Sequence, residues 1–92
     1  MRITVTFVGI LAELIHEGSF EVRLSEGATY GDLLQEIKRE FGHVIPDLFW
    51  DPKVNAFKDP VFAVANGRAL ESPDTSLRDT DEVRFLTLVA GG

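Results

Sequence analysis

The sequence contains no cysteine among its 92 residues. Without thiols the chain cannot form a disulfide, supply a cysteine nucleophile or bind a metal through thiolates. The absence of disulfides fits a reducing compartment, and we expect a cytoplasmic protein. No run approaches the roughly 20 apolar residues that cross a membrane, and residues 1–4 begin with strand-like alternation rather than a signal peptide. We expect no membrane partner.

Basic residues are also scarce. Nine lysines and arginines stand against fifteen aspartates and glutamates, which gives a formal net charge of −6. Nucleic-acid binders carry basic patches that neutralise phosphates, and here the basic residues are scattered, so we do not expect a nucleic-acid partner. The acidic surface favours a basic protein partner or serves solubility alone. The length predicts one domain over 1–92, with a modest core and little room for an enclosed active site.

Local patterns predict a mixture of strands and one main helix. The main helix is expected over 29–41, with Thr29 as N-cap, Asp32 as its capping-box partner and Gly42 as the C′ glycine. Residues 10–16 are expected to form a loop with a short helical turn. Alternation of apolar and polar residues predicts strands at 2–8, 19–24, 61–66 and 82–89, and a short return at 68–70 after the Asn66-Gly67 turn.

Segment 43–60 follows no single period and holds three of the four prolines. It is too apolar for a free linker. We predict a packed excursion with a helical turn around 46–50. Trp50 could anchor a partner, but we favour a role in holding its own long loop.

The order of elements predicts an α+β protein in which one helix covers a mixed sheet of four to five strands. The first and last strands are both strongly apolar, and pairing them in parallel at the centre gives the β-grasp, or ubiquitin-like, topology. In the last strand, Val83 and Phe85 share one face, whereas Leu86 and Leu88 share the other. This strand is therefore either covered on both faces or meets a partner on its second face.

Other candidate sites are weak. His16 and His43 are isolated and have no cysteine or second histidine at ligand spacing. Asp79, Asp81 and Glu82 lack the glycine and glutamate spacing of a calcium loop and are interpreted as turn residues. The serines have no His–Asp context, and the glycines form no phosphate-binding motif. We expect no metal, no bound cofactor and no self-sufficient active site.

Three motifs resemble a known family. They are Ala63-Val64-Ala65-Asn66-Gly67, the stretch LRDTDEV at 77–83, and the terminal Val89-Ala90-Gly91-Gly92. With the order of elements, they resemble the MoaD/ThiS family of ubiquitin-like sulfur carriers. The likeness is closer to MoaD, the small subunit of molybdopterin synthase, than to the shorter ThiS carriers of thiamine synthesis. The sequence departs from the family at Thr80, which replaces a common glycine, at 86–88, where a proline pair often stands, and in the longer segment 43–60.

The resemblance implies chemistry at the terminal carboxylate. An E1-like (MoeB/ThiF-like) enzyme would adenylate Gly92 with ATP, and a sulfur donor would convert the adenylate into a thiocarboxylate. The sulfur would serve molybdopterin, and hence molybdenum cofactor, biosynthesis, with a MoaE-like large subunit as partner. Gly91 and Gly92 lack a Cβ, which lets a flexible tail enter a narrow channel. The chain would then be a synthase subunit or a co-substrate.

Partner contacts are expected near the tail, at Ala90, Val89, Leu88, Leu86 and Phe7. Two alternatives are that the main helix covers Leu86 and Leu88, and that Phe7 is plain core. The sulfur could instead be delivered to cysteine synthesis, tRNA thiolation or thiamine synthesis. Alternatively, the chain is a protein modifier whose Gly92 forms an isopeptide bond to a lysine, or a structural interaction module.

Overall fold

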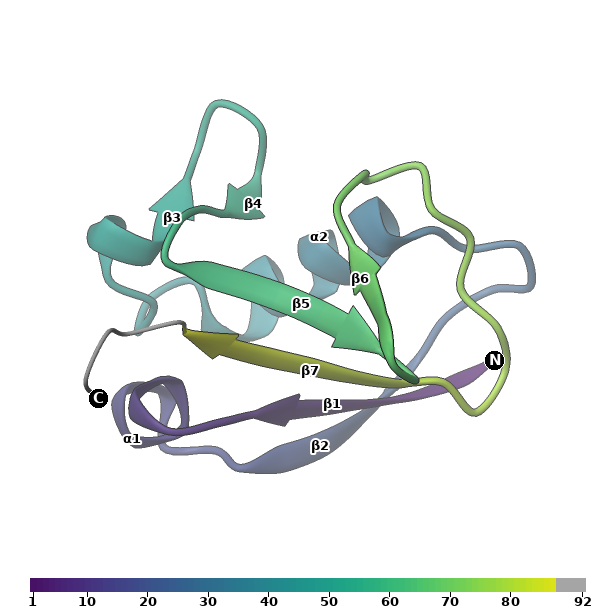
Figure 1. Cartoon of the computed structure of the whole chain (residues 1–92), viewed down its shortest axis with the longest axis horizontal. Coiled ribbons are helices and arrows are strands. Elements are labelled where there is room, and N and C mark those ends of the chain that lie inside the picture. Colours follow the sequence, from purple (N-terminus) through teal and green to yellow (C-terminus); the bar gives the residue numbers. More distant parts are fainter. Residues whose placement is uncertain (88–92) are drawn as a thin grey trace.

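The first and last strands lie side by side at the centre of a five-stranded mixed sheet (Figure 1). The computed structural model describes residues 1–87. Strands β1 (Arg2–Phe7) and β7 (Glu82–Thr87) are parallel, and all other neighbours in the sheet are antiparallel. The sheet order is β2-β1-β7-β5-β6, with β2 at Ser19–Arg23, β5 at Val61–Ala65 and β6 at Arg68–Leu70. The predicted β-grasp fold is confirmed.

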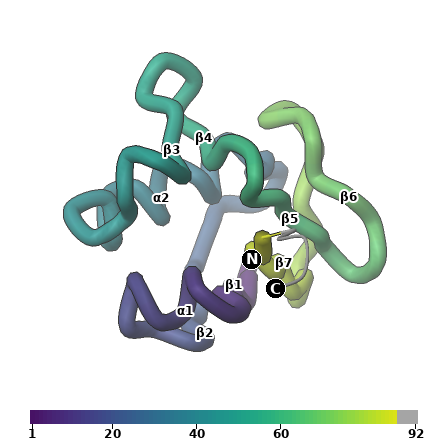
Figure 2. Tube along the Cα trace, turned by 60° about the vertical axis from the view of Figure 1, so that its left-hand side comes forward, coloured from purple at the N-terminus to yellow at the C-terminus, as the bar shows by residue number. Residues whose placement is uncertain are grey.

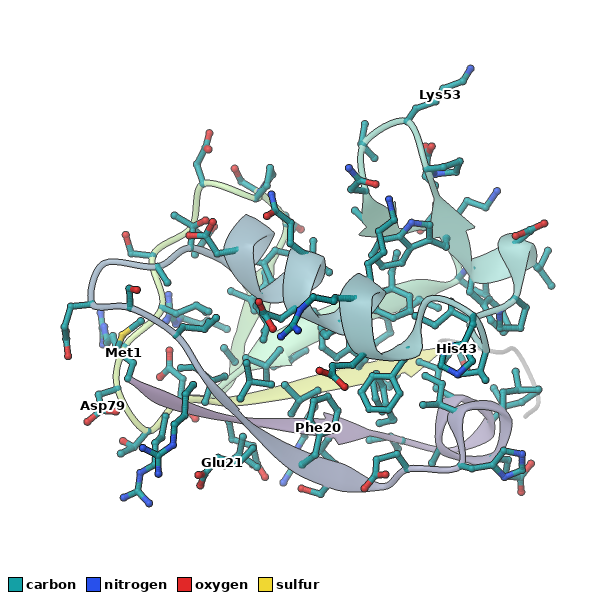
Figure 3. The ribbon with its side chains drawn as sticks, turned by 180° about the vertical axis from the view of Figure 1, so that it is seen from behind. Met1, Phe20, Glu21, His43, Lys53 and Asp79 are labelled. Carbon is teal, nitrogen blue, oxygen red and sulfur yellow. The ribbon has the colours of Figure 1, made fainter. Side chains whose placement is uncertain are left out.

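Helix α2 (Tyr30–Phe41) covers one face of this sheet, as the view from behind shows (Figure 3). Its predicted capping box is confirmed. The Thr29 hydroxyl accepts the Asp32 backbone N–H at 3.3 Å, and the Asp32 carboxylate accepts the Thr29 backbone N–H at 2.9 Å. The apolar stripe of the helix is buried against the sheet, at Leu33, Leu34 and Ile37. None of the helices found in residues 1–87 is long and apolar enough to cross a bilayer.

Gly42 ends helix α2 differently from the prediction. Its φ of −55° and ψ of −30° are right-handed helical values, not those of a left-handed C′ glycine. The chain instead continues into a further turn, where the N–H groups of Val44 and Ile45 donate to the Phe41 carbonyl. A Cβ at Gly42 would collide with the Lys38 carbonyl oxygen. Glycine is therefore needed here for close approach rather than for a positive φ.

Helix α1 (Ile10–Ile15) occupies the segment where a loop with a short helical turn was expected. It follows β1 directly and buries Leu11 and Ile15. With only six residues, it depends on tertiary packing rather than on intrinsic helix stability.

Segment 43–60 is packed, as predicted, and contains the expected helical turn at η1 (Asp47–Phe49). A small antiparallel hairpin was not expected. It pairs β3 (Trp50–Asp51) with β4 (Ala56–Phe57), and its tip carries Lys53 away from the sheet (Figure 3). The Trp50 and Phe57 rings meet edge to face at 5.1 Å, and Trp50 is buried. Trp50 thus holds its own loop. The hairpin lies beside α2 in the tube view (Figure 2).

The core between α2 and the sheet is rich in aromatic rings. Phe7 is 2% exposed, and its ring centroid lies 5.7–5.8 Å from those of Phe20, Phe41 and Phe85. Phe7 is therefore a core residue, as one of the two alternatives for it predicted. Its side chain is enclosed by its own fold rather than presented to a partner.

Burial of the chain's single tyrosine gives one prediction about alkaline pH. Burial raises the pKa of Tyr30 because it disfavours the phenolate. In the unfolded chain a tyrosine ionises near pH 10, so the stabilisation is complete below about pH 10 and is lost above it. We expect Tyr30 to contribute a loss of about 1.4 kcal/mol per pH unit above that point. Urea unfolding of the native chain and Tyr30→Phe at pH 9 and 11 would isolate this loss, since all other groups are shared. Equal pH slopes would contradict it.

Two motifs behind the family resemblance meet at Asp81, which is 2% exposed. Its carboxylate accepts hydrogen bonds from the Asn66 side-chain amide at 2.6 Å and the Arg78 backbone N–H at 2.9 Å, and it lies 3.4 Å from the Arg68 guanidinium. Asp81 therefore joins the β5–β6 turn to the start of β7. Interpreting it as an ordinary turn residue missed this buried role.

Thr80, which replaces the glycine often found in the family, has a φ of 68°. A β-branched residue is strained in this left-handed region, whereas glycine is not. We expect Thr80→Gly to raise the free energy of unfolding by about 1 kcal/mol, or the melting temperature by about 4–8 °C. Thr80→Ala retains a Cβ, so it should raise the free energy of unfolding by less than Thr80→Gly does. A melting temperature of Thr80→Gly at or below that of the native chain would contradict the argument.

Candidate partner-binding site

The last strand presents Leu86 on the face of the sheet opposite α2. Side chains alternate along β7, so Val83 and Phe85 are fully buried on the helix side, whereas Leu86 is partly exposed. Figure 1 is viewed from this open face, with α2 behind the sheet. In the part of the chain that the structure describes, no helix covers this face. The alternative that the main helix covers Leu86 is therefore wrong.

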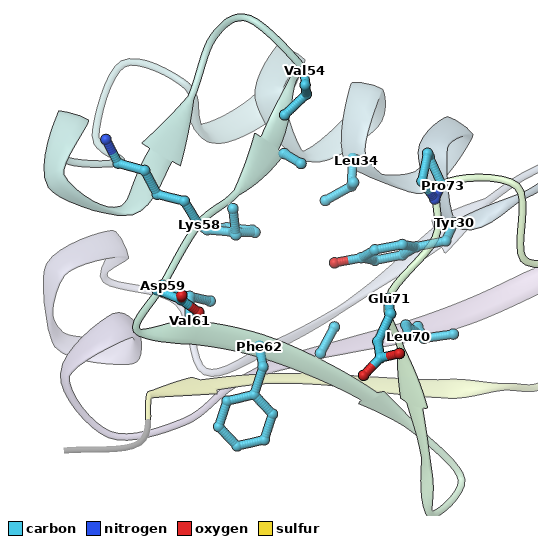
Figure 4. Close-up of a pocket in the computed structure, with 13 residues that line it drawn as sticks. Tyr30, Leu34, Val54, Lys58, Asp59, Val61, Phe62, Leu70, Glu71 and Pro73 are labelled. Atoms are coloured by element: carbon cyan, nitrogen blue, oxygen red, sulfur yellow. The ribbon is translucent and has the colours of Figure 1, made fainter. Parts of the chain in front are cut away.

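The neighbours of Leu86 extend this apolar surface. On β5, Phe62 is directly opposite Leu86 and Val64 is opposite Arg84. Phe62 lies on the other side of β5 from Tyr30 (Figure 4). Val8 follows β1, is 41% exposed, and donates its N–H to the Phe85 carbonyl at 3.0 Å. We call Val8, Phe62, Val64 and Leu86 the apolar patch.

The parallel pairing of β1 and β7 determines where this patch lies. Because parallel strands run in the same direction, β1 and β7 end at the same edge of the sheet. Val8 and helix α1 begin at that edge, and residues 88–92 continue from it. Ile10 and Leu14 on α1 are also exposed, at 45% and 37%. Exposed apolar residues are therefore concentrated beside the point from which the terminal segment departs, as is typical of protein-binding surfaces.

Charged pairs border the opposite end of the open face. Arg84 lies 3.2 Å from Glu82, and Arg2 lies 3.9 Å from Glu21. Exposed pairs of this kind add little stability. Their value in an interface is orientation and selectivity, because mismatched charges at a rim disfavour wrong partners.

The ThiS family profile matches residues 5–92 of the chain. The chain belongs to the ThiS family. It is therefore a member of a family of ubiquitin-like small modifiers and sulfur carriers.

Individual relatives of this ThiS-family chain support the assignment. The chain is 31% identical to small archaeal modifier protein 3 of Haloferax volcanii over 99 aligned positions, which cover all of both chains. A putative molybdopterin converting factor, subunit 1, from Pyrococcus furiosus has a similar structure, with 27% identity, a TM-score of 0.72, and 97% and 99% of the two chains covered. SAMP1 from Haloferax volcanii shares the fold at 20% identity, with a TM-score of 0.83 and full coverage of both chains.

The structure brings only part of the predicted ThiS-family site together. Leu86 lies in the apolar patch, whereas Phe7 lies in the core. The other predicted site residues, Leu88, Val89, Ala90, Gly91 and Gly92, lie outside residues 1–87, so their roles stay predictions. Phe62 and Val64 were missed. The signal was present, because 61–65 is apolar at every position, as expected for a strand whose two faces both meet apolar groups.

The side chains considered for metal binding do not gather. Within residues 1–87, no three histidine, aspartate or glutamate side chains are placed to hold a metal ion together. His16 and His43 are exposed at the ends of α1 and α2.

Proposed function

We propose that this ThiS-family chain is a sulfur carrier whose cargo is held at the carboxylate of Gly92. The observation that supports this most strongly is the position of the apolar patch, at the edge of the sheet from which the segment ending in Gly91-Gly92 continues. A carrier needs a reactive terminus and a surface that presents it to other proteins. This sequence provides both within a few residues of each other.

The proposed reaction has two balanced steps. An E1-like enzyme of the MoeB/ThiF type joins the Gly92 carboxylate to the α-phosphate of ATP and releases pyrophosphate. A sulfide ion then attacks the activated carbon and expels AMP, which leaves a C-terminal thiocarboxylate. The adenylate is required because a carboxylate is a poor electrophile. ATP is used by the activating enzyme and is not a cofactor of this chain.

Chain length limits where such a partner can bind. The five residues after Thr87 span at most about 17 Å when fully extended. An enzyme that acts on Gly92 must therefore approach the edge of the sheet that carries Leu86, Phe62 and Val8. Burying these apolar side chains would supply affinity, while the charged pairs farther along the open face would orient the complex.

We further propose that the sulfur is delivered in molybdopterin biosynthesis, with a MoaE-like large subunit as acceptor partner. The resemblance to the MoaD branch and to the putative molybdopterin converting factor subunit 1 of Pyrococcus furiosus supports this choice. In that assembly the chain would be the small synthase subunit and would complete its partner's active site with its tail. Cysteine synthesis, tRNA thiolation and thiamine synthesis are the competing acceptors of the same chemistry.

A second candidate function is protein modification, in which Gly92 forms an isopeptide bond to a lysine. The whole-length identity of 31% to small archaeal modifier protein 3 of Haloferax volcanii favours it. Both functions begin with the same adenylate. They differ in the nucleophile that displaces AMP, which is sulfur in one case and a lysine amine in the other.

Intact mass distinguishes these functions. The chain would be incubated with ATP, a sulfide source and a MoeB-like enzyme, then weighed. A mass gain equal to replacing one oxygen by sulfur supports the carrier. Conjugates in which Gly92 is joined to a lysine of another protein, without that gain, support the modifier. Neither product with several such enzymes overturns both proposals.

The apolar patch gives a separate prediction. Replacing both Leu86 and Phe62 by alanine should weaken binding to the activating enzyme at least about tenfold, because apolar anchors dominate interface energetics. Val54→Ala is the matched control, since Val54 is 67% exposed and lies in the turn of the β3–β4 hairpin. Dissociation constants from calorimetry would check this. Equal affinities for the double variant and the control would place the interface elsewhere.

A further inference from the structure

A second concave site lies on the α2 side of the sheet, beneath the β3–β4 hairpin (Figure 4). Its volume is about 590 Å³, within the range of binding pockets. The walls come from α2, the hairpin and the β5–β6 pair, and they are mainly apolar, including Tyr30, Leu34, Ala56, Phe57, Val61 and Leu70. The excursion at 43–60 therefore builds one wall of this cleft.

Tyr30 supplies a polar group inside the cleft. Its side chain is 7% exposed, and its hydroxyl points into the space between the hairpin and β5 (Figure 4). Among residues 1–87 no group hydrogen-bonds to this hydroxyl, and burial alone raises its pKa. The hydroxyl oxygen itself is accessible from the cleft, since within residues 1–87 the fully buried side-chain nitrogen or oxygen without a partner is Trp50 Nε1. The Tyr30 hydroxyl can therefore bond to a ligand that enters the cleft.

The rim of the cleft is acidic. Asp59 precedes β5 and Glu71 follows β6, and both residues line the cleft (Figure 4). Leu70 pairs with Ala63, so Glu71 lies beside the middle of β5. Lys58 also lines the cleft, but its ammonium group points away from it (Figure 4). The charge facing an incoming group is therefore negative, in keeping with the net charge of −6.

We propose that this cleft binds an arginine side chain presented by a partner protein. Arginine has an apolar stem that suits the walls and a planar cation that stacks on aromatic rings such as Tyr30 and Phe57. The guanidinium carries five N–H donors and no acceptor. The Tyr30 hydroxyl oxygen and the carboxylates of Asp59 and Glu71 are the matching acceptors. A lysine head lacks the planar surface and is less suited to stacking.

The cleft and the apolar patch share one residue, Phe62, whose side chain lies on the other side of β5 from Tyr30 (Figure 4). The other patch residues, Val8, Val64 and Leu86, do not line the cleft. The inference goes beyond the proposed function and does not depend on it. It assigns the long segment 43–60 a role in recognition.

The test is a titration of the full, ¹⁵N-labelled chain with N-acetyl-arginine methylamide at about 0.15 M salt, where weak surface attraction is screened. We expect saturable shifts of the amides of Tyr30, Leu34, Phe57 and Glu71. The uncharged citrulline counterpart should give none. Glu71→Gln should weaken binding about threefold or more, as expected when one exposed charge is lost. Tyr30→Phe, which preserves the ring, should also weaken it.

Asp74→Asn is the matched control, because Asp74 is exposed, lies outside the cleft lining and carries the same charge. Its affinity should equal that of the native chain. Equal weakening in Glu71→Gln and Asp74→Asn would reveal only general attraction to an acidic surface and would overturn the proposal. Equal shifts with citrulline, or shifts elsewhere on the chain, would overturn it as well. Amide spectra of the free variants establish that each is folded.

Discussion

A chain that lacks Gly92 is expected to gain thiocarboxylate at least about 100-fold more slowly than the native chain, because misplacing a reacting group by even 1 Å can cost this much. The shortened chain still ends in a carboxylate, but that group is withdrawn by about 3.5 Å. The stability of the fold should not change. The sheet, both helices and the described core are all built from residues 1–87. The measurement is the rate of mass gain with ATP, sulfide and the activating enzyme.

Two further variants separate length from bulk at this terminus. One extra alanine after Gly92 moves the carboxylate outward and should be as damaging as the deletion. Gly91→Ala preserves the length but adds a Cβ next to the reacting residue, so its rate should also fall if the tail enters a narrow channel. Conversion of the deletion variant at the native rate, with an unchanged melting temperature, would remove Gly92 from the mechanism.

Asp81→Ala is expected to lower the free energy of unfolding by about 3 kcal/mol, because it removes a buried carboxylate together with its charge-assisted hydrogen bonds. The substitution removes the acceptor of the Arg78 backbone N–H and of the Asn66 amide. It also removes the carboxylate that forms an ion pair with Arg68. For a domain of this size such a loss lowers the melting temperature by about 12–24 °C. Calorimetry or urea unfolding would measure it.

Asp79→Ala is the control for Asp81→Ala. Asp79 is exposed, and its carboxylate accepts a hydrogen bond from the Arg2 backbone N–H at 2.8 Å, which is the main cause that lowers the pKa of this group. Its removal leaves no buried donor unpaired, so the effect should be much smaller. Equal losses of unfolding free energy in Asp79→Ala and Asp81→Ala would show that the hydrogen bonds around Asp81 stabilise the fold no more than the exposed one at Asp79. Asp81→Asn, which preserves shape but turns one acceptor into a donor, should fall between them.

Local chemistry explains why much of the fold could be predicted. The capping box at Thr29 and Asp32 satisfies N–H groups that every helix leaves open, so it marks a helix start wherever it occurs. Asn66 and Gly67 both have positive φ, at 49° and 86°, which these residues tolerate and a tight hairpin requires. Alternating apolar residues predicted β1 and β7, because a strand that buries one face needs an apolar residue at every second position.

Tertiary contacts decided what local patterns left open. The β3–β4 hairpin has two residues in each strand, too few to show a period, and exists because Trp50 packs on Phe57. Asp81 is buried because two turns distant in sequence meet around its carboxylate. Helix α2 does not end in a left-handed glycine, since a further turn continues past Gly42.

The candidate site shows the same division. The sequence alone was enough to predict the order of the five strands of the main sheet and of helix α2, and it shows directly the acidic character, the absence of thiols and the terminal Gly91-Gly92. It could not decide between core and surface for Phe7 and Leu86, because alternation defines two faces of a strand without saying which one the helix covers. The parallel pairing of β1 with β7 and the packing of α2 settled this. They enclosed Phe7 and placed Leu86 opposite Phe62 on the open face, because a register between strands distant in sequence exists only once the sheet has formed.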